Sequence, residues 1–359
     1  MSTLYESARV GSIEVANRIF LAPLTRSRAQ GDFVPSDYAP LYYEQRASGG
    51  LLITEASQIS SEAVGYVQTP GIYSEEQVEG WKKVTKAVHD KGGKIVLQLW
   101  HVGRISHTEL QPNEQAPLAP SAIQANAQTF LSDVGPVNVS MPRAMTLEDI
   151  RRTLSDYKRA ALNAKKAGFD GVEIHAANGY LLDQFLTDGS NKRDDEYGGS
   201  VQNRFRFVKE VIESVLQEWP ADKVGIRLSP TGQFNDVSDS DRLGTFSYVI
   251  DKLNEFNLAY LHIVEAFPGV EVSAEDRKVV TTLAANWNGF YIANGGYDKL
   301  SAEEAVESGS ADAVSFGRQF LANPDLPERL ASGAQLNPVD ESTLYGGTEV
   351  GYTDYPFLK

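Results

Sequence analysis

Short apolar runs alternate with amphipathic stretches along the chain, and this alternation limits the folds open to it. Apolar runs bounded by turn residues are typical of buried strands, and apolar spacings of three and four are typical of helices. We expect strands at residues 18–24, 51–56, 94–100, 171–175, 224–228, 260–264, 290–293 and 313–316. We expect helices at residues 39–47, 75–91, 146–167, 201–218, 244–256, 274–285, 302–308 and 325–331. Such alternation indicates an α/β protein with a parallel sheet.

Two architectures fit this pattern, a closed (β/α)8 barrel and an open, doubly wound sheet. The open sheet usually has a glycine-rich turn after its first strand, but Ala22-Pro23-Leu24-Thr25 stands there instead. The 359 residues show no internal repeat and no linker, and (β/α)8 barrels fall within this length. We therefore predict that residues 1–359 form a single α/β domain, a (β/α)8 or TIM barrel.

One connection is too long for an ordinary loop. Residues 103–143 contain five prolines and two short alternating stretches near residues 129–131 and 137–139. Long ordered connections are often lids over a site, so we expect a small β-hairpin cap over the C-terminal mouth of the barrel. Residues 334–359 are rich in tyrosine and glycine, and we expect them to form a packed C-terminal extension.

Composition narrows the classes of function. The chain has no cysteine, which excludes disulfides, a thiol nucleophile and cysteine-ligated clusters. A formal net charge of −15 disfavours nucleic acid and anionic membranes as partners. No stretch reads as a secretory signal, and none approaches the roughly 20 apolar residues of a membrane span. We expect a soluble, cytoplasmic protein that acts on small molecules.

Residues 169–186 carry the clearest chemical signal. The segment begins as a buried strand and then presents His175, Asn178 and Tyr180 within six residues. Asn178-Gly179 is a turn signal, so these polar groups gather where a strand ends, which is where α/β proteins place their chemistry. Two neutral donors suit polarising a carbonyl, and the phenol suits protonating the neighbouring carbon. Alternatively, Tyr180 only packs at the start of the helix that begins at Leu181.

Other notable residues fall on or after the expected strands. A hydroxyl at Thr25 can cap the next element, and the small Ala56 leaves room for a flat ring. Gln98 lies among apolar residues, so its amide needs either backbone partners or the polar edge of a bound ring. Arg227 alternates with apolar residues and needs a carboxylate or a bound anion.

Glycine-containing loops follow the last two strands. Gly295 and Gly296 follow the seventh strand, and Gly317 with Arg318 follows the eighth. Glycine lets backbone N–H groups approach an anion, and arginine adds a fork of donors. Barrels commonly bind phosphate with these two loops. We expect a phosphate group here.

Metal and nucleophile chemistry find no support in the sequence. The five histidines show no ligand spacing, and there is no P-loop, GxGxxG motif or nucleophile elbow. We expect His262 to be a hydrogen-bonded core residue and His89 to lie near the end of its helix.

Taken together, these motifs resemble the Old Yellow Enzyme family of flavin-dependent ene-reductases. The similarity extends from about residue 18 to residue 356 and includes segments 22–26, 99–104, 175–186, 317–318, 323–326 and 351–356. The resemblance implies a non-covalently bound FMN that is reduced by a nicotinamide cofactor, usually NADPH rather than NADH. It implies reduction of activated alkenes such as enones and maleimides, and of quinone or nitro acceptors.

The resemblance also assigns roles to residues. It implies that His175 and Asn178 hold the substrate carbonyl and that Tyr180 supplies the proton. The positions that it assigns to FMN are Pro23, Leu24, Thr25, Ala56, Gln98, His175, Arg227, Gly295, Gly296, Gly317 and Arg318. Those that it assigns to the substrate, besides His175 and Asn178, are Tyr66, Trp100 and Tyr345. The loop 266–277 matches poorly, and we expect it to shape specificity.

Two rival functions stay open at this point. A phosphate-binding barrel isomerase or aldolase would use the glycine loops for its substrate, but we find no lysine at a strand end for a Schiff base. A flavin-binding protein without turnover would take up FMN and reduce no alkene.

Overall fold

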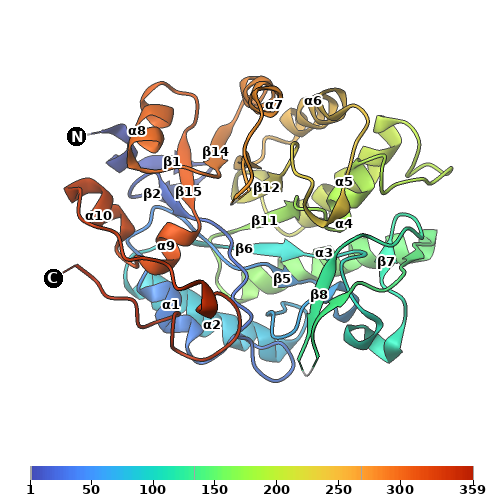
Figure 1. The fold of residues 1–359 in the computed structure, drawn as a ribbon, viewed down its shortest axis with the longest axis horizontal. Helices are drawn as coiled ribbons and strands as arrows, with labels where there is room; N and C mark the ends of the chain where they lie inside the picture. The colour runs from blue at the N-terminus through green and yellow to red at the C-terminus, as the bar shows by residue number, and fades with distance from the viewer. Residues whose placement is uncertain (1, 133, 268, 359) are drawn as a thin grey trace.

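Eight parallel strands close into a barrel (Figure 1). The strands are β3 (Ile19–Leu21), β4 (Leu52–Ile53), β6 (Ile95–Trp100), β11 (Gly171–Ala176), β12 (Val224–Leu228), β13 (Tyr260–Val264), β14 (Phe290–Asn294) and β15 (Ala313–Phe316). They follow one another around the ring in chain order, and the pairing of β6 with β11 joins its two halves. The computed structural model describes residues 2–132, 134–267 and 269–358, so the cap, the loop 266–277 and the C-terminal extension each contain one position outside the described residues.

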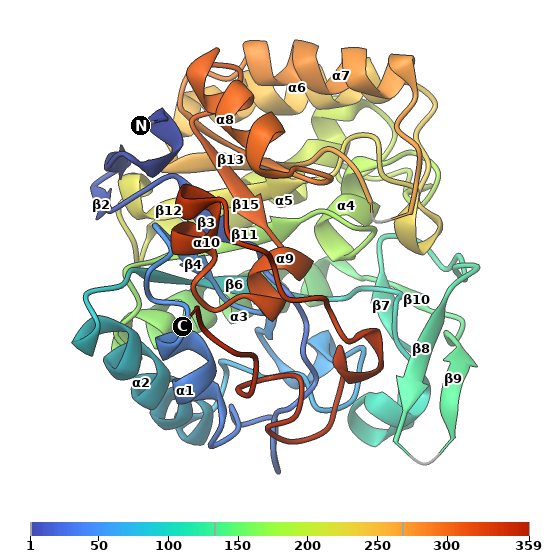
Figure 2. The ribbon, with the colours of Figure 1, turned by 60° about the vertical axis from the view of Figure 1, so that its left-hand side comes forward.

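Helices follow the strands and surround the barrel (Figure 2). They are α1 (Ala39–Glu44), α2 (Glu75–Asp90), α3 (Leu147–Lys166), α5 (Val201–Leu216), α6 (Arg242–Leu253), α7 (Ala274–Ala285), α8 (Lys299–Glu307) and α10 (Leu326–Ser332). Two short helices, α4 (Leu181–Leu186) and α9 (Arg318–Ala322), stand directly after β11 and β15. The predicted (β/α)8 barrel is confirmed, although β3 and β4 are shorter than expected and α9 was not predicted.

Local sequence signals explain where the long helices begin. The Thr146 hydroxyl accepts a hydrogen bond from the backbone N–H of Asp149 at 3.1 Å, and the Asp149 carboxylate accepts one from the N–H of Thr146 at 2.8 Å. Ser74 and Gln77 form the same reciprocal pair at the start of α2. Each pair satisfies N–H groups that the first turn of a helix leaves free.

An N-terminal hairpin that the sequence pattern did not predict closes one end of the barrel. Its antiparallel strands are β1 (Ala8–Val10) and β2 (Ile13–Val15). Val10, Ile13 and Val15 are buried in one cluster with Phe20 and Tyr260 from the barrel strands. The hairpin therefore buries the apolar floor of the barrel, at the end away from the carboxyl ends of the strands.

The segment 103–143 forms the expected cap. Its antiparallel hairpin is β8 (Gln128–Leu131) with β9 (Gly135–Asn138), and β7 (Leu118–Ala119) pairs with β10 (Arg143–Ala144). Ala125 and Val139 are buried against Trp100 and Tyr180, which lie at strand ends on the C-terminal side. The cap thus borders the mouth of the barrel.

Alternation along the strands divides the barrel interior into an apolar floor and a polar upper layer. Tyr260 and Ile292 belong to the floor. Two positions further along the same strands, His262 and Asn294 face the same side, since side chains alternate with period two. The other polar members of this layer are Gln98, Glu173, Arg227 and Ser315, and the register pairs Gln98 with Glu173, Arg227 with His262, and Asn294 with Ser315.

Gly225 makes room in the floor of the barrel for Tyr260. A Cβ atom at residue 225 would lie 2.1 Å from the Tyr260 ring on the paired strand. We expect Gly225→Ala to lower the free energy of unfolding by about 1–3 kcal/mol or more, because overpacking a well-packed core forces neighbours to move. Urea unfolding would measure the change. An unfolding midpoint equal to that of the parent would contradict this account of the floor.

Candidate active site

His175 occupies the end of β11 beside Arg227 of β12, because these two residues are register partners. Its ring is buried, and its Nδ1 atom has no hydrogen-bond partner within the part of the chain that the structure describes. Burial lowers the pKa of His175 well below its ordinary value, and the Arg227 charge lowers it further. The imidazole is therefore neutral at physiological pH.

Asn178 and Gly179 form the turn that the sequence indicates, and both have positive φ angles, 60° and 73°. The backbone N–H of Asn178 donates to the Ser229 hydroxyl at 2.7 Å, and its carbonyl accepts from the Asn235 amide at 2.9 Å. The side-chain oxygen of Asn178 is buried without a partner among the described residues. The turn thus presents the Asn178 amide group, with this unpartnered oxygen, three residues after His175.

Tyr180 packs within an aromatic cluster at the mouth. Its ring meets the His175 ring at a centroid distance of 5.2 Å and the Trp100 ring at 5.0 Å, both edge-on. Tyr66 stacks on Trp100, and its hydroxyl lies 3.3 Å from that of Tyr180. Burial raises the pKa of Tyr180 well above 10 and that of Tyr66 to about 12, so both phenols stay protonated.

Tyr345 lies on the C-terminal extension and is 68% exposed. It is near enough to Tyr66 and Tyr180 to raise their pKa values. The extension is held by Arg26, whose guanidinium donates to the carbonyls of Leu344 at 2.9 Å and Gly351 at 2.8 Å. The structure therefore brings Tyr345 to the mouth, as a residue open to solvent.

Gln98, Glu173, His262 and Ser315 form a buried hydrogen-bonded chain across the barrel. The Gln98 amide donates to Glu173 at 2.6 Å, the other Glu173 oxygen lies 2.9 Å from His262 Nδ1, and His262 Nε2 lies 2.8 Å from the Ser315 hydroxyl. His262 is the satisfied core histidine that we expected. The sequence leaves backbone groups or a bound ring as partners of the Gln98 side chain, and its Nε2 atom donates to the Glu173 carboxylate. Glu173 was not predicted as a member of this hydrogen-bonded chain, although a charged residue within an apolar strand is a signal for one.

Arg227 is buried in the same layer. One of its terminal nitrogens donates to Asn294 at 2.7 Å, while Nε has no partner among the residues described. Burial lowers its pKa to about 10, against the opposing effect of Glu173, so the guanidinium remains charged at neutral pH. A positive charge with a free donor stands at the end of the barrel where His175 lies.

The loop after β3 and the end of β4 supply the remaining residues near the mouth. Pro23, Leu24 and Thr25 are half-buried, and Ala56 is 5% exposed. Glu55, next to Ala56, accepts a hydrogen bond from the N–H of Arg26 at 3.0 Å and so joins the two segments.

The glycine loops lie side by side because β14 and β15 are neighbours. Gly295 has a φ of 121°, and a Cβ atom there would lie 2.5 Å from the Ala266 carbonyl oxygen. Gly296 also has a positive φ, 72°, and Gly317 precedes α9. Arg318 is half-exposed and pairs with Glu341 at 2.7 Å. The expected loops are adjacent, and Arg318 forms its ion pair with Glu341 at the surface.

Comparisons with known proteins agree with this geometry. Residues 3–337 match the model of the NADH:flavin oxidoreductase / NADH oxidase family. 12-Oxophytodienoate reductase 1 of Oryza sativa subsp. japonica is 48% identical over 357 residues, which cover 98% of this chain and 92% of that protein. Morphinone reductase superposes with a TM-score of 0.95 at 46% identity, over 99% of this chain and 96% of its own.

The chain belongs to the Old Yellow Enzyme family. A homologue of old yellow enzyme from Zymomonas mobilis superposes with a TM-score of 0.91 at 42% identity, over 99% of this chain and all of its own. The resemblance inferred from the motifs is thus confirmed, and the protein is a flavin oxidoreductase. A solved structure of morphinone reductase contains tetrahydroNAD. Within the described ranges, no helix has the length and apolar character to span a bilayer, and no three His, Cys, Asp or Glu side chains are grouped to hold a metal.

The residues of this Old Yellow Enzyme member fit FMN, the cofactor that the family implies. His175 Nδ1 and Arg227 Nε are buried atoms without protein partners among the described residues, and such atoms need a polar group. Gly295 and Gly296 keep two adjacent backbone positions free of side chains. These features suit a ligand with a polar ring edge and a phosphate.

Glu55 gives the site end of the barrel a pH-dependent contribution to stability. Burial raises its pKa from 4.5 to about 7, so the folded state binds this proton more tightly than the unfolded state. The contribution is present at low pH and is lost as the pH rises through about 7. Between pH 4 and pH 8, ionisation of this group should lower the free energy of unfolding of the parent by up to about 3 kcal/mol. We expect Glu55→Gln to lack this decrease. Urea unfolding across this range, with the exposed Glu14→Gln as control, would test it; parallel curves for Glu55→Gln and the parent would refute it.

Proposed function

We propose that this flavin oxidoreductase is an FMN-dependent ene-reductase that uses NADPH in preference to NADH. It reduces the C=C bond of α,β-unsaturated carbonyl compounds and also accepts quinones and nitro compounds. The observation that carries the proposal is the cluster of neutral hydrogen-bonding groups at the end of β11, with His175 and Tyr180 buried and Asn178 half-buried. Residues 1–359 act as one FMN-binding domain, with a cap insertion at about 103–143 and an extension at about 334–359.

Several residues would hold FMN. Arg227 would place its charge and its free Nε beside the pyrimidine edge, where positive charge favours an electron-rich ring. Arg318 would exchange Glu341 for the phosphate, because a guanidinium binds phosphate as a two-point donor. The others are Pro23, Leu24, Thr25, Ala56, Gln98, His175, Gly295, Gly296 and Gly317. Bound FMN would supply the hydride-transfer chemistry that connects the nicotinamide with the alkene.

His175 and Asn178 form the carbonyl clamp of the proposed site. Hydride addition at the β-carbon of an enone drives negative charge onto the carbonyl oxygen. A neutral imidazole and an amide each offer an N–H donor, and neither has to lose a proton to stabilise that charge. The low pKa of His175 keeps its ring neutral over the working range of pH.

Tyr180 is the proposed proton donor. The α-carbon needs a proton from a group that is still protonated at neutral pH, and a phenol meets this condition. The environment of Tyr180 strengthens the argument, since burial holds its pKa well above 10. Its hydroxyl contacts that of Tyr66, which can accept or pass on a hydrogen bond.

Aromatic residues around the clamp would select the substrate. Trp100 and Tyr66 present stacked rings beside Tyr180, and Tyr345 stands at the open side. In the loop 266–277, Phe267 stacks on Phe234 at a centroid distance of 5.8 Å. A flat, apolar enone with one carbonyl fits such a setting.

The decisive experiment is enone reduction by the parent and by His175→Ala/Asn178→Ala. We expect the purified parent to be yellow, to hold equimolar FMN and to reduce 2-cyclohexenone with NADPH. The double variant should lose at least about 10²–10³ in rate, the usual cost of one missing donor at a developing oxyanion. A parent that takes up no FMN, or a double variant that turns over the enone at the parental rate, would overturn the proposal.

Tyr180→Phe separates proton transfer from the other steps. We expect it to retain FMN and to slow reduction of 2-cyclohexenone by about 10²–10⁴, the usual contribution of a positioned general acid. Benzoquinone needs no proton on carbon, so its reduction by the same variant should change far less. Tyr66→Phe, which removes the partner hydroxyl, should slow the enone less than Tyr180→Phe does. Equal slowing of enone and quinone would mean that Tyr180 shapes the pocket and donates no proton.

A further inference from the structure

The Asn178-Gly179 turn has a backbone that needs outside support. Two successive residues adopt the left-handed conformation, with φ angles of 60° and 73°. That conformation is unfavourable for residues with a Cβ atom. At Gly179 the loop after β12 leaves no space for one, because a Cβ atom would lie 2.4 Å from the Phe234 carbonyl oxygen. Some interaction must stabilise the turn in this form.

Asp183 provides that support from the first turn of α4. Its side chain is buried, and its Oδ2 atom accepts hydrogen bonds from the backbone N–H of Gly179 at 2.8 Å and from the Ser229 hydroxyl at 3.3 Å. The Ser229 oxygen in turn accepts from the N–H of Asn178 at 2.7 Å. One carboxylate oxygen therefore holds both N–H groups of the turn, one directly and one through a hydroxyl.

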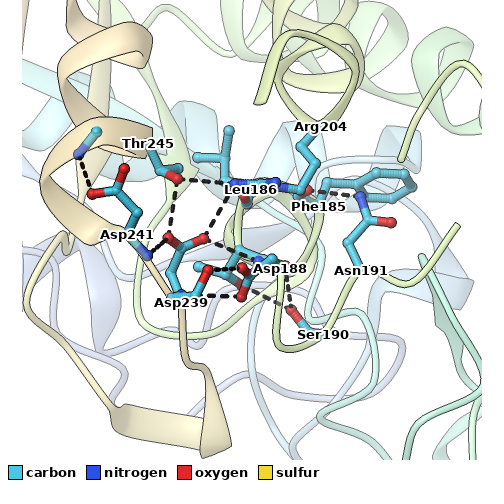
Figure 3. Close-up of polar contacts among 12 residues, drawn as sticks. Phe185, Leu186, Asp188, Ser190, Asn191, Arg204, Asp239, Asp241 and Thr245 are labelled. Atoms are coloured by element: carbon cyan, nitrogen blue, oxygen red, sulfur yellow. Dashed lines mark hydrogen bonds and ion pairs between the residues drawn. The ribbon is translucent and has the colours of Figure 1, made fainter. Parts of the chain in front are cut away.

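The loop after β12 begins at Ser229 and is held by hydrogen bonds around a buried ion pair between Arg204 and Asp239 (Figure 3). The Asp239 carboxylate lies 3.4 Å from the Arg204 guanidinium and accepts from the N–H of Asp188 at 3.0 Å. Its side chain is only 1% exposed. The same loop supplies Asn235, which donates to the Asn178 carbonyl. The turn is thus held by α4 and by an anchored loop.

Simple helix capping does not explain Asp183. A capping carboxylate at this position of a helix would accept from the N–H of the N-cap residue, which is Tyr180. The bond reaches one residue further back, to Gly179, and so belongs to the turn. Burial raises the pKa of Asp183 to about 7, so its carboxylate carries a desolvation cost that its two donors partly offset. Ionisable groups whose pKa values are perturbed in this way are concentrated at functional sites.

We propose that Asp183, acting through Ser229 and Gly179, is a positioning residue that fixes the turn and thereby aims Asn178 and Tyr180 at the substrate. The inference rests on the proposed ene-reductase function, because it assigns a purpose to this geometry. Among the described residues, the Asp183 carboxylate accepts hydrogen bonds from Gly179 N–H and the Ser229 hydroxyl and none from the Asn178 side chain or the Tyr180 hydroxyl, so its effect passes through the backbone of the turn.

Amide exchange and kinetics together test the role. The variants are Asp183→Ala, Asp183→Asn and Ser229→Ala, and the control is Asp149→Ala, which removes a buried carboxylate from the same position of α3. In the holoenzyme we expect Asp183→Ala to lower kcat/KM for 2-cyclohexenone by about 10²-fold, as small misplacements of reacting groups do. Affinity for the unreactive cyclohexanone should weaken, FMN content should stay constant, and Asp149→Ala should match the parent in all three measurements.

Hydrogen exchange followed by mass spectrometry measures the protection of the turn amides and does not depend on enzyme activity. The peptide containing the Asn178 and Gly179 amides should exchange faster in Asp183→Ala and Ser229→Ala than in the parent or in Asp149→Ala. Asp183→Asn keeps the volume and one acceptor oxygen, so it should lie between Asp183→Ala and the parent. If Asp183→Ala does not fold, Asp183→Asn and Ser229→Ala are the variants that test the proposal.

Coupling to Asn178 distinguishes positioning from general support. In an Asn178→Ala background the loss of Asp183 should cost less than in the parent, because residues that act through one another are not additive. Parental exchange and parental kcat/KM in all foldable Asp183 and Ser229 variants would overturn the proposal, as would full additivity. A parent that reduces no enone would instead defeat the proposed function, and amide exchange would still decide whether Asp183 holds the turn.

Discussion

Glu173 is a fully buried charge, and the barrel interior is arranged to satisfy it. Its oxygens meet Gln98 and His262, and His262 continues to Ser315. Removing one partner of such a group leaves an uncompensated charge, which is strongly destabilising. These hydrogen bonds link side chains from four strands, so satisfying the carboxylate creates a polar layer across the barrel. The same layer contains Arg227, whose positive charge is felt by Glu173 and by the ring of His175.

Desolvation keeps His175 and Tyr180, which lie beside this layer, neutral. It lowers the pKa of His175 and raises the pKa of Tyr180, so both carry their protons in the form that can donate a hydrogen bond. Arg227 retains its charge because its pKa falls only to about 10. A site with one fixed cation and several neutral donors can respond to negative charge that develops during a reaction without changing its own protonation state.

The sequence was sufficient to predict the barrel because its strands and helices have strong local signals. Val224–Leu228, Tyr260–Val264 and Ala274–Ala285 form elements with the bounds that the apolar pattern indicates. The hairpin β1–β2 escaped because three-residue strands carry too little periodicity to be recognised. The helix α9, with five residues, escaped for a similar reason.

The site was predictable only in part. His175, Asn178 and Tyr180 lie close together in the chain, so a single strand end and turn bring them together. The partners of the turn come from elsewhere: Ser229 lies 51 residues from Asn178, and this contact depends on the pairing of β11 with β12. Asp183 was inside the informative segment, but a single acidic residue in a helix gives no sign that its carboxylate reaches back to a turn.

The C-terminal extension has a consequence for how the protein is made. Arg26 donates to the Gly351 carbonyl across 325 residues of chain, and Tyr352 stacks on Tyr42 at 4.1 Å. The first barrel strand, β3, likewise pairs with β15, which is synthesised much later. During synthesis, therefore, the residues around Thr25 cannot reach their final packing until the ribosome has released the chain as far as residue 352. Contacts between such distant residues slow folding, and the unfinished barrel exposes strand edges that a chaperone can shield.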